Sequence, residues 1–170
     1  PEFPVVLLTP QGATFTQATA ERLATQPEIA LLCGHYQGVD ERVRQHLATE
    51  ELSIGDYVLT GGEPAAIVVV DAVARLLPGA LGSEEALAAD SHASGFLQHP
   101  QYTRPAGFRE WKIPEILQSG NHQEVERWRR EESLRRTFER RPDLLRKAHL
   151  SEHEQRFLEL LGWVRDDSRT

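Results

Sequence analysis

Short apolar runs alternate with helical stretches along the first half of the chain. The runs at residues 4–8, 29–33 and 57–59 are apolar on both faces, and turn-forming residues follow each of them, the first turn lying at residues 9–12. Strands of this kind, alternating with helices, are typical of a parallel sheet covered on both sides. The pattern therefore predicts an α/β fold. The helices predicted between the strands are residues 16–24 and 39–47.

A third helix is predicted over residues 64–77, with Pro64 at its start and Pro78 just past its end. Its interior carries only two charged side chains, Asp71 and Arg75, four residues apart. A helix that is apolar nearly all round has to be buried all round. It is either the central helix of a single core or part of an interface between two copies of the chain, and we favour a homodimer.

The second half of the chain predicts helices joined by irregular segments. Asn121 with Glu124, and Ser151 with Glu154, are spaced as the N-terminal caps of two helices, the first of which stops before Pro142. We expect three parts. They are an α/β domain over residues 1–81, a flexible linker rich in small polar residues over 82–99, and a small helical domain over 100–170.

The composition is that of an ordinary globular protein, with 39% hydrophobic and 26% charged residues and a net charge of −7. The single cysteine, Cys33, excludes an intrachain disulfide and is typical of a reducing compartment. Because the apolar runs are too short to span a bilayer, we expect no membrane partner and a cytoplasmic location. The chain begins at Pro1 and has no Met, so we expect it to be a fragment or a trimmed form.

Charge is distributed unevenly along the chain. Residues 1–99 carry 4 basic and 13 acidic side chains, whereas residues 100–147 carry 12 basic and 8 acidic ones. The basic segment is either a surface that binds a phosphate backbone or a solvated helix face on which Glu and Arg side chains pair.

Glycines follow the apolar runs, where the ligands of open α/β sheets bind. The sequence contains neither G-x-G-x-x-G nor a Walker A lysine motif, so it does not support a Rossmann dehydrogenase or a P-loop NTPase. His149 and His153 match the string H-x-x-E-H, but the predicted cap at Ser151 leaves His149 outside the helix, and we predict no metal site. Asp90 and Arg75 are the charged residues of most interest, as functional groups or as a loop carboxylate and a helix ion pair.

Six segments together resemble the bacterial tRNA (guanine-N1)-methyltransferases of TrmD type, in the SPOUT class. They are residues 8–12 (LTPQG), 33–42 (CGHYQGVDER), 53–63 (SIGDYVLTGGE), 71–75 (DAVAR), 100–105 (PQYTRP) and 119–122 (SGNH). The basic run over residues 128–142 also fits. The resemblance covers nearly the whole chain in order.

The resemblance implies a trefoil-knotted α/β domain, a homodimer, and S-adenosylmethionine bound in the knot loops. The residues it implies for the cofactor are Thr9, Pro10, Gly34, Tyr36, Gly38, Ile54, Gly55, Asp56, Tyr57, Val58, Leu59, Gly61 and Gly62. A role for Mg²⁺ is left open.

The implied substrate is the guanine immediately 3′ of the tRNA anticodon. Asp90 would remove the proton from N1, and Arg75 would stabilise charge that builds towards O6. The residues expected to contact tRNA are Gln37, Ser91, Arg104, Arg129, Arg130, Arg135 and Arg136.

Two positions depart from the family pattern: Gln37 stands where Glu is general, and His35 stands where Arg is common. The family also carries a first strand and a Gly-rich loop ahead of the segment that begins here. The alternatives to a guanine-N1 methyltransferase are a catalytically incompetent RNA-binding or dimerisation fragment, and a SPOUT enzyme that methylates a ribose 2′-hydroxyl.

Overall fold

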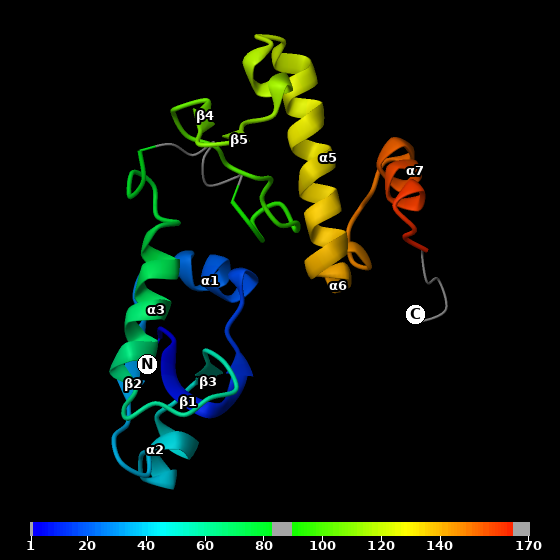
Figure 1. Ribbon diagram of the computed structural model, residues 1–170. Helices are drawn as coiled ribbons and strands as arrows, with labels where there is room; N and C mark the ends of the chain where they lie inside the picture. Colours follow the sequence, from blue (N-terminus) through cyan, green and yellow to red (C-terminus); the bar gives the residue numbers. More distant parts are fainter. Residues whose placement is uncertain (1, 83–89, 165–170) are drawn as a thin grey trace. The chain divides into compact units, whose positions relative to one another are not determined.

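The computed structural model describes residues 2–82 and 90–164. The chain divides into two compact units, residues 1–84 and 85–170 (Figure 1). Each unit has its own hydrophobic core. Within the described residues, no helix combines the length and the apolar character needed to cross a membrane.

The first unit is built on a three-stranded parallel sheet, which confirms the predicted α/β class. Its strands are β1 (Val5–Thr14), β2 (Ala30–Cys33) and β3 (Glu50–Ser53), in the order β2-β1-β3. Three helices follow the strands in turn (Figure 1). They are α1 (Gln17–Ala24), α2 (Glu41–His46) and α3 (Glu63–Ala74).

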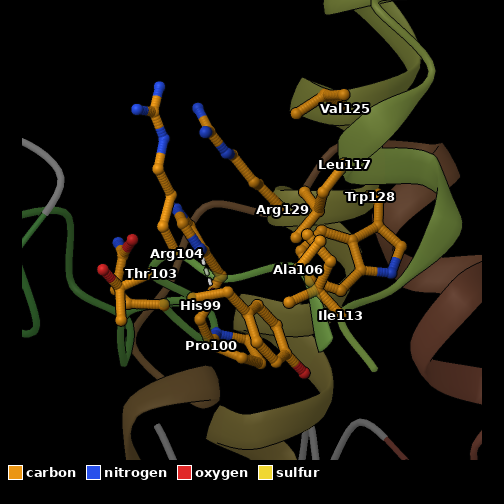
Figure 2. A pocket seen from close by; sticks show the side chains of 12 residues that line it. His99, Pro100, Thr103, Arg104, Ala106, Ile113, Leu117, Val125, Trp128 and Arg129 are labelled. Carbon is orange, nitrogen blue, oxygen red and sulfur yellow. Dashed lines mark hydrogen bonds between the residues drawn. The ribbon is translucent and has the colours of Figure 1, made fainter. Parts of the chain in front are cut away.

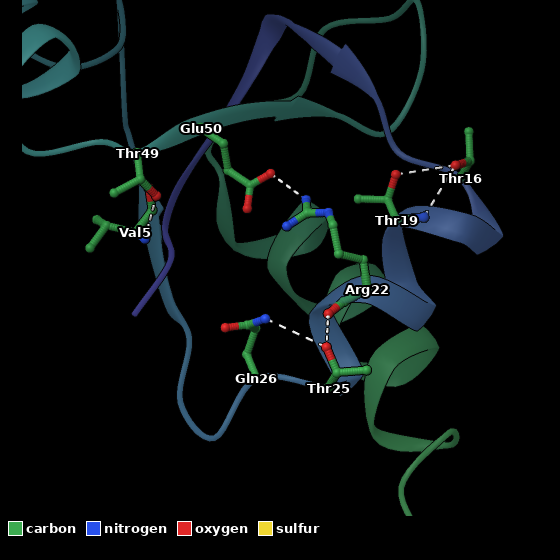
Figure 3. Close-up of polar contacts among 8 residues, drawn as sticks. All are labelled: Val5, Thr16, Thr19, Arg22, Thr25, Gln26, Thr49 and Glu50. Atoms are coloured by element: carbon green, nitrogen blue, oxygen red, sulfur yellow. Dashed lines mark hydrogen bonds and ion pairs between the residues drawn. The ribbon is translucent and has the colours of Figure 1, made fainter. Parts of the chain in front are cut away.

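The core of this unit lies where α1 and α3 pack on the sheet. Val6 and Leu8 of β1 meet Leu23 of α1 and Val69 of α3, all of them buried. Polar contacts fix the edges. Thr16 caps α1 through the Thr19 N–H, and Arg22 pairs with Glu50 of β3 at 2.5 Å (Figure 3).

The third strand does not lie at residues 57–59, where the apolar run predicts it, but at Glu50–Ser53. Glu50 and Glu51 interrupt the apolar pattern by which the sequence would predict this strand. Both are neutralised from outside the sheet, Glu50 by Arg22 and Glu51 by Arg44 at 2.9 Å. An apolar run is therefore a poor guide to a strand whose charges are paired.

The turn predicted at residues 9–12 is also wrong, because β1 continues to Thr14. Its register with β3 shifts between Leu8 and Ala13, both of which pair with Leu52. Residues 9–12 are therefore a bulge within the strand rather than the end of it.

Helix α3 buries one face only in the described chain. Ala65, Val69 and Val73 are buried, whereas Ile67 is 69% and Val70 52% exposed. The alternative of a central helix in a single core is therefore wrong for this unit. The helix also ends at Ala74, three residues before the predicted end, with Arg75 as its C-cap.

The second unit is mainly helical. It contains a short antiparallel pair, β4 (Gly107–Phe108) and β5 (Trp111–Lys112), and a 3₁₀ turn, η1 (Glu115–Gln118). The helices α5 (His122–Arg140), α6 (Pro142–Leu145) and α7 (Glu152–Leu160) follow. Both predicted caps are confirmed, since Asn121 accepts the Glu124 N–H and Ser151 forms a reciprocal capping box with Glu154.

The segment just before the β4–β5 pair is anchored to α5. Phe96 lies in the same core as Leu134. The Leu97 N–H donates to Thr137 Oγ1 at 2.9 Å, and Ser133 Oγ donates to the Leu97 carbonyl at 2.6 Å. Residues 96–98, assigned from the sequence to the linker, therefore pack with the helical unit, while residues 83–89 of that linker lie outside the described residues.

Candidate functional site

A pocket of about 430 Å³ opens in the first unit, at the carboxyl ends of the three parallel strands. Its walls come from three segments. These are the β1 bulge, the loop from β2 to α2, and the loop from β3 to α3. Since this edge of an open parallel sheet is where ligands bind, it is the strongest candidate site in the unit.

The predicted cofactor residues converge on this pocket. Those that line it are Thr9, Pro10, Gly34, Tyr36, Gly38, Ile54, Gly55, Tyr57, Val58, Leu59, Gly61 and Gly62. The remaining one, Asp56, is exposed beside Gly55 and is not part of the lining. Gln37, predicted to contact tRNA, also lines the pocket.

Glu41 and Arg44 also line the pocket, from α2, and neither is among the site residues expected from the sequence. Arg44 pairs with Glu41 on its own helix and with Glu51 of β3. Their position in the sequence, in a helix just after a predicted strand, could have indicated that they line the site. A helix that directly follows a parallel strand begins at the same edge of the sheet as the strand's carboxyl end.

The two longer loops are joined to each other by backbone contacts. The Gly62 N–H donates to the Gly34 carbonyl at 3.0 Å, and His35 forms isolated bridges with Gly38 and Gly61. At Gly62 a Cβ atom would lie 2.7 Å from the Cα of Cys33, so only glycine allows α3 to begin this close to β2.

Tyr36 stands at the tip of the turn over residues 35–38 with φ of 59°. Its side chain is fully exposed although it lines the pocket. The left-handed region is unfavourable for a bulky residue. The turn is closed by the Gly38 N–H, which donates to the His35 carbonyl at 3.0 Å.

His35 contacts Glu63 beside the pocket, with 2.7 Å between Nε2 and Oε1. The pKa of Glu63 is lowered by its own backbone N–H at the start of α3 and by His35. The pKa of the Cys33 thiol is raised by burial and by the Glu63 charge. His35 therefore binds a carboxylate of its own chain and favours the charged form of that group.

The two residues expected to act in catalysis lie in different units. Arg75 is the C-cap of α3, and its backbone N–H donates to the Asp71 carbonyl at 3.2 Å. Asp90 opens the described part of the second unit, where its carbonyl accepts the Ala93 N–H at 3.3 Å. Next to it, Ser91 Oγ accepts the Gln98 N–H at 2.9 Å.

The basic residues expected to contact tRNA fall into two groups. Arg130, Arg135 and Arg136 bind partners inside the second unit: Arg130 lies 2.6 Å from Glu154, Arg135 lies 3.2 Å from Glu132, and Arg136 donates to the Gln98 carbonyl. Arg104 and Arg129 line a second pocket of about 270 Å³, and Arg129 also lies 2.6 Å from Glu126.

Within residues 2–82 and 90–164, no group of three or more His, Cys, Asp or Glu side chains is arranged to hold a metal ion. The groups that the first pocket offers for hydrogen bonds to a ligand are backbone groups of the glycine-rich loops and a few polar side chains. Its remaining walls are apolar, with Leu7, Leu8, Ile54 and Val58 among them.

Residues 1–147 match the family model described as tRNA (Guanine-1)-methyltransferase TrmD. Among similar curated proteins, tRNA (guanine-N(1)-)-methyltransferases from Dehalococcoides mccartyi and Halalkalibacterium halodurans are each 59% identical to this chain, over 156 and 155 residues. They cover 92% and 91% of it. The corresponding protein of Moorella thermoacetica is 58% identical over 167 residues, which is 98% of this chain.

These matches account for 63% of the length of the first two relatives and 66% of the third. The chain thus spans somewhat less than two thirds of the length of the first two. Over that span the match runs through the first pocket and most of the helical unit. The chain belongs to the tRNA (guanine-1)-methyltransferase family of TrmD type.

Proposed function

We propose that the chain carries the cofactor pocket and the catalytic residues of a tRNA (guanine-N1)-methyltransferase that uses S-adenosylmethionine. The observation that carries the proposal is the convergence of three segments, two of them glycine-rich and all far apart in the sequence, on one pocket at the carboxyl edge of the sheet. Family membership supports the same activity. The proposed target is N1 of the guanine immediately 3′ of the anticodon.

The residues of the first pocket suit S-adenosylmethionine. Backbone groups at Gly34, Gly38 and Gly61 offer hydrogen bonds of the kind an adenine edge and a ribose require, and Ile54 and Leu59 offer apolar walls for the adenine ring. When bound, the cofactor supplies an electrophilic methyl group on a sulfonium. The chain's own task is to hold it and to exclude water.

In the proposed mechanism Asp90 acts on the guanine. N1 carries a proton and its lone pair is delocalised, so it is a poor nucleophile until that proton is removed. A carboxylate within hydrogen-bond reach takes the proton during attack. Negative charge then builds towards O6, where the guanidinium of Arg75 stabilises it.

We further propose that the second unit binds the tRNA backbone. The basic residues proposed for this contact are Arg104, Arg129, Arg130, Arg135 and Arg136. Ser91 of the same unit and Gln37 of the first unit are also proposed to contact tRNA. A guanidinium has five N–H donors, so the intramolecular partners of Arg130, Arg135 and Arg136 leave donors for phosphate oxygens. Because tRNA is the proposed substrate, we place the protein in the cytoplasm.

The trefoil knot and the homodimer are also proposals. Support for the dimer comes from α3, whose outer face presents Ile67, Val68 and Val70 to solvent. A contiguous apolar face on a helix is typical of a protein–protein contact. Support for the knot comes from family membership and from the close backbone contacts between the two longer loops of the pocket.

The test is methyl transfer from labelled S-adenosylmethionine to two tRNA transcripts, one with guanine and one with adenine 3′ of the anticodon. We expect label in the guanine transcript only. Replacing Asp90 by Asn removes the base, so it is expected to lower the rate about 10²- to 10⁴-fold without weakening cofactor or tRNA binding. Asp143→Asn, a change to a surface carboxylate of α6 that pairs with Arg141, is the matched control.

Full activity of Asp90→Asn would disprove the proposed base. No label in either transcript, with tRNA still bound, would favour the second candidate, a catalytically incompetent RNA-binding fragment. One observation favours that alternative: Gln37 lines the pocket in place of the family's general Glu.

A further inference from the structure

The second pocket, in the helical unit, has the composition of a nucleotide site. The segment at residues 99–106 forms one side of it, and η1 and the first turns of α5 form the other. Trp128 stands on one wall, and the side chains of Arg104 and Arg129 extend beside each other on another (Figure 2). At about 270 Å³ the pocket falls just below the range typical of sites for drug-sized ligands, about 300–1,000 Å³, so it suits a base rather than a whole cofactor.

Two aromatic rings in this pocket are incompletely packed against each other. The ring centroids of Tyr102 and Trp128 lie 6.5 Å apart with an interplanar angle of 42°, and Tyr102 is 48% exposed. Proteins that bind single-stranded nucleic acids without sequence preference hold the bases by stacking them on aromatic side chains. The tilted, open pair offers a face on which a base can stack.

Arg129 carries a buried donor that no described residue satisfies. Its Nη1 atom lies 2.6 Å from Glu126 Oε1. Its Nε atom is buried and, among the side chains that the structure describes, is the one such polar atom without a hydrogen-bond partner. A buried donor left unpaired is unfavourable. The Nη atoms carry the other N–H donors of this guanidinium, and Glu126 accepts from Nη1 only, so donors are left for an oxygen acceptor in the pocket.

The β4–β5 hairpin extends the same surface. Ala106 and Ile113 at its base line the pocket and are joined by a hydrogen bond of 3.0 Å. Exposed Phe108 and Trp111 stand on the hairpin itself, and the guanidinium of Arg109 lies 5.5 Å and 5.9 Å from their ring centroids. Aromatic rings interleaved with arginine are the pattern that contacts unpaired bases and the phosphates between them.

We infer that this pocket binds one unstacked nucleotide of a single-stranded RNA loop, with the base on Trp128 and Tyr102 and the phosphate on Arg104 and Arg129. The inference rests on the proposed tRNA substrate and names a contact away from the methylated base. The hairpin tip at Phe108, Arg109 and Trp111 holds the neighbouring nucleotide.

The test measures the binding of an anticodon stem-loop RNA to the whole chain by fluorescence anisotropy. Trp128→Leu keeps apolar bulk but removes the aromatic face, and we expect it to weaken binding roughly 5- to 100-fold. Trp128→Phe, which keeps a ring, retains most of the affinity. Tyr102→Leu, on an exposed segment, gives the same direction if the Trp128 variants do not fold, as judged by circular dichroism.

The arginine contact has a matched control on the same helix. Arg129→Gln is expected to weaken binding and to reduce the salt dependence by about one phosphate contact. Arg127→Gln removes one charge from a residue that pairs with Glu131 and does not line the pocket, and we expect little change. A set of RNA variants, each with one abasic position, identifies the nucleotide that occupies the pocket. At that position, the loss of affinity from the abasic site and the loss from Trp128→Leu are not additive, because both remove the same stacking contact.

Equal affinities for Trp128→Leu, Tyr102→Leu and the unaltered chain, or equal losses for Arg127→Gln and Arg129→Gln, would overturn the nucleotide site. If the unaltered chain still methylates tRNA in that case, the proposed function stands and only the site is wrong. If the unaltered chain binds no RNA at all, both are wrong.

Discussion

Tyr36 combines two features that rarely meet in one residue. It has a left-handed backbone and a fully exposed aromatic side chain, at the mouth of the first pocket. Packing within the described chain does not account for this conformation. Backbone strain of this kind is concentrated at functional sites, where the surrounding structure imposes it.

Replacing Tyr36 by Asn is therefore expected to stabilise the first unit and to weaken cofactor binding. Asn adopts the left-handed region more readily, so the free energy of unfolding should rise by about 1 kcal/mol. The affinity for S-adenosylmethionine should fall, because a wall of the pocket is lost. Urea unfolding followed by circular dichroism and calorimetric titration measure the two effects.

Tyr36→Phe keeps both the ring and the strained backbone and serves as the control. Its stability should match that of the unaltered chain. A Tyr36→Asn protein that is less stable than Tyr36→Phe would contradict the account of strain.

Among the elements, α7 depends most clearly on one side chain. Glu154 accepts the Ser151 N–H at 2.8 Å, which completes the capping box, and its other oxygen lies 2.6 Å from Arg130 Nε on α5. Burial raises the pKa of Glu154, but the contacts with Arg130 and Ser151 outweigh it and hold the pKa below its ordinary 4.5. One carboxylate therefore both begins α7 and ties it to α5.

Glu154→Gln should lower the stability of the second unit by about 1–2 kcal/mol at neutral pH. Because the folded-state pKa is depressed, the contribution is complete above about pH 4.5 and is lost as the pH falls through the folded value. The difference between the two proteins should therefore shrink in acid. All three tryptophans lie in the second unit, so their fluorescence reports its unfolding.

Glu152→Gln is the matched control. Glu152 lies in the same first turn but is exposed, and its ion pair with Arg156 is long at 3.9 Å. Its effect should stay within about 0.5 kcal/mol. A pH-independent difference for Glu154→Gln would show that the charge of Glu154 is not what stabilises the helix.

The sequence predicts an element well when the interactions that define it are between residues close together in the sequence. Caps at Asn121 and Ser151 are local, and both are found as predicted. Strand β3 was missed because its glutamates are neutralised by Arg22 and Arg44, residues whose proximity only the fold creates. The lining of the first pocket was anticipated largely through family resemblance, whereas Glu41 and the unpaired Arg129 Nε required the structure.

At the scale of the whole molecule, the two units have separate cores and different charge: the first carries 11 acidic and 4 basic side chains, and the second carries 15 of each. The acidic first unit would repel a polyanion, so the proposed contact with RNA falls to the basic segment over residues 100–147, within the second unit. The first unit in turn carries the apolar face of α3, which its own core leaves exposed.

We predict that this face joins two copies of the chain. Replacing both Ile67 and Val70 by Glu removes buried apolar area and brings like charges together, so the dimer dissociation constant should rise at least about tenfold. Sedimentation velocity at micromolar concentration measures the change.

Leu160→Glu, at an exposed apolar position on α7, should leave the dimer intact. An unaltered chain that sediments as a monomer at these concentrations would contradict the prediction.

The bulge in β1 also affects how tightly a ligand can bind. Residues 9–12 are held at both ends, since Leu8 and Ala13 both pair with Leu52 and the Phe15 N–H donates to the Ser53 carbonyl at 2.8 Å. Ordering a free backbone costs about 1–2 kcal/mol of conformational entropy per residue. Because folding has already fixed these four residues, a ligand that meets this wall of the pocket does not have to order them. A ligand of this pocket therefore binds more tightly than it would if residues 9–12 were flexible and had to be ordered on binding.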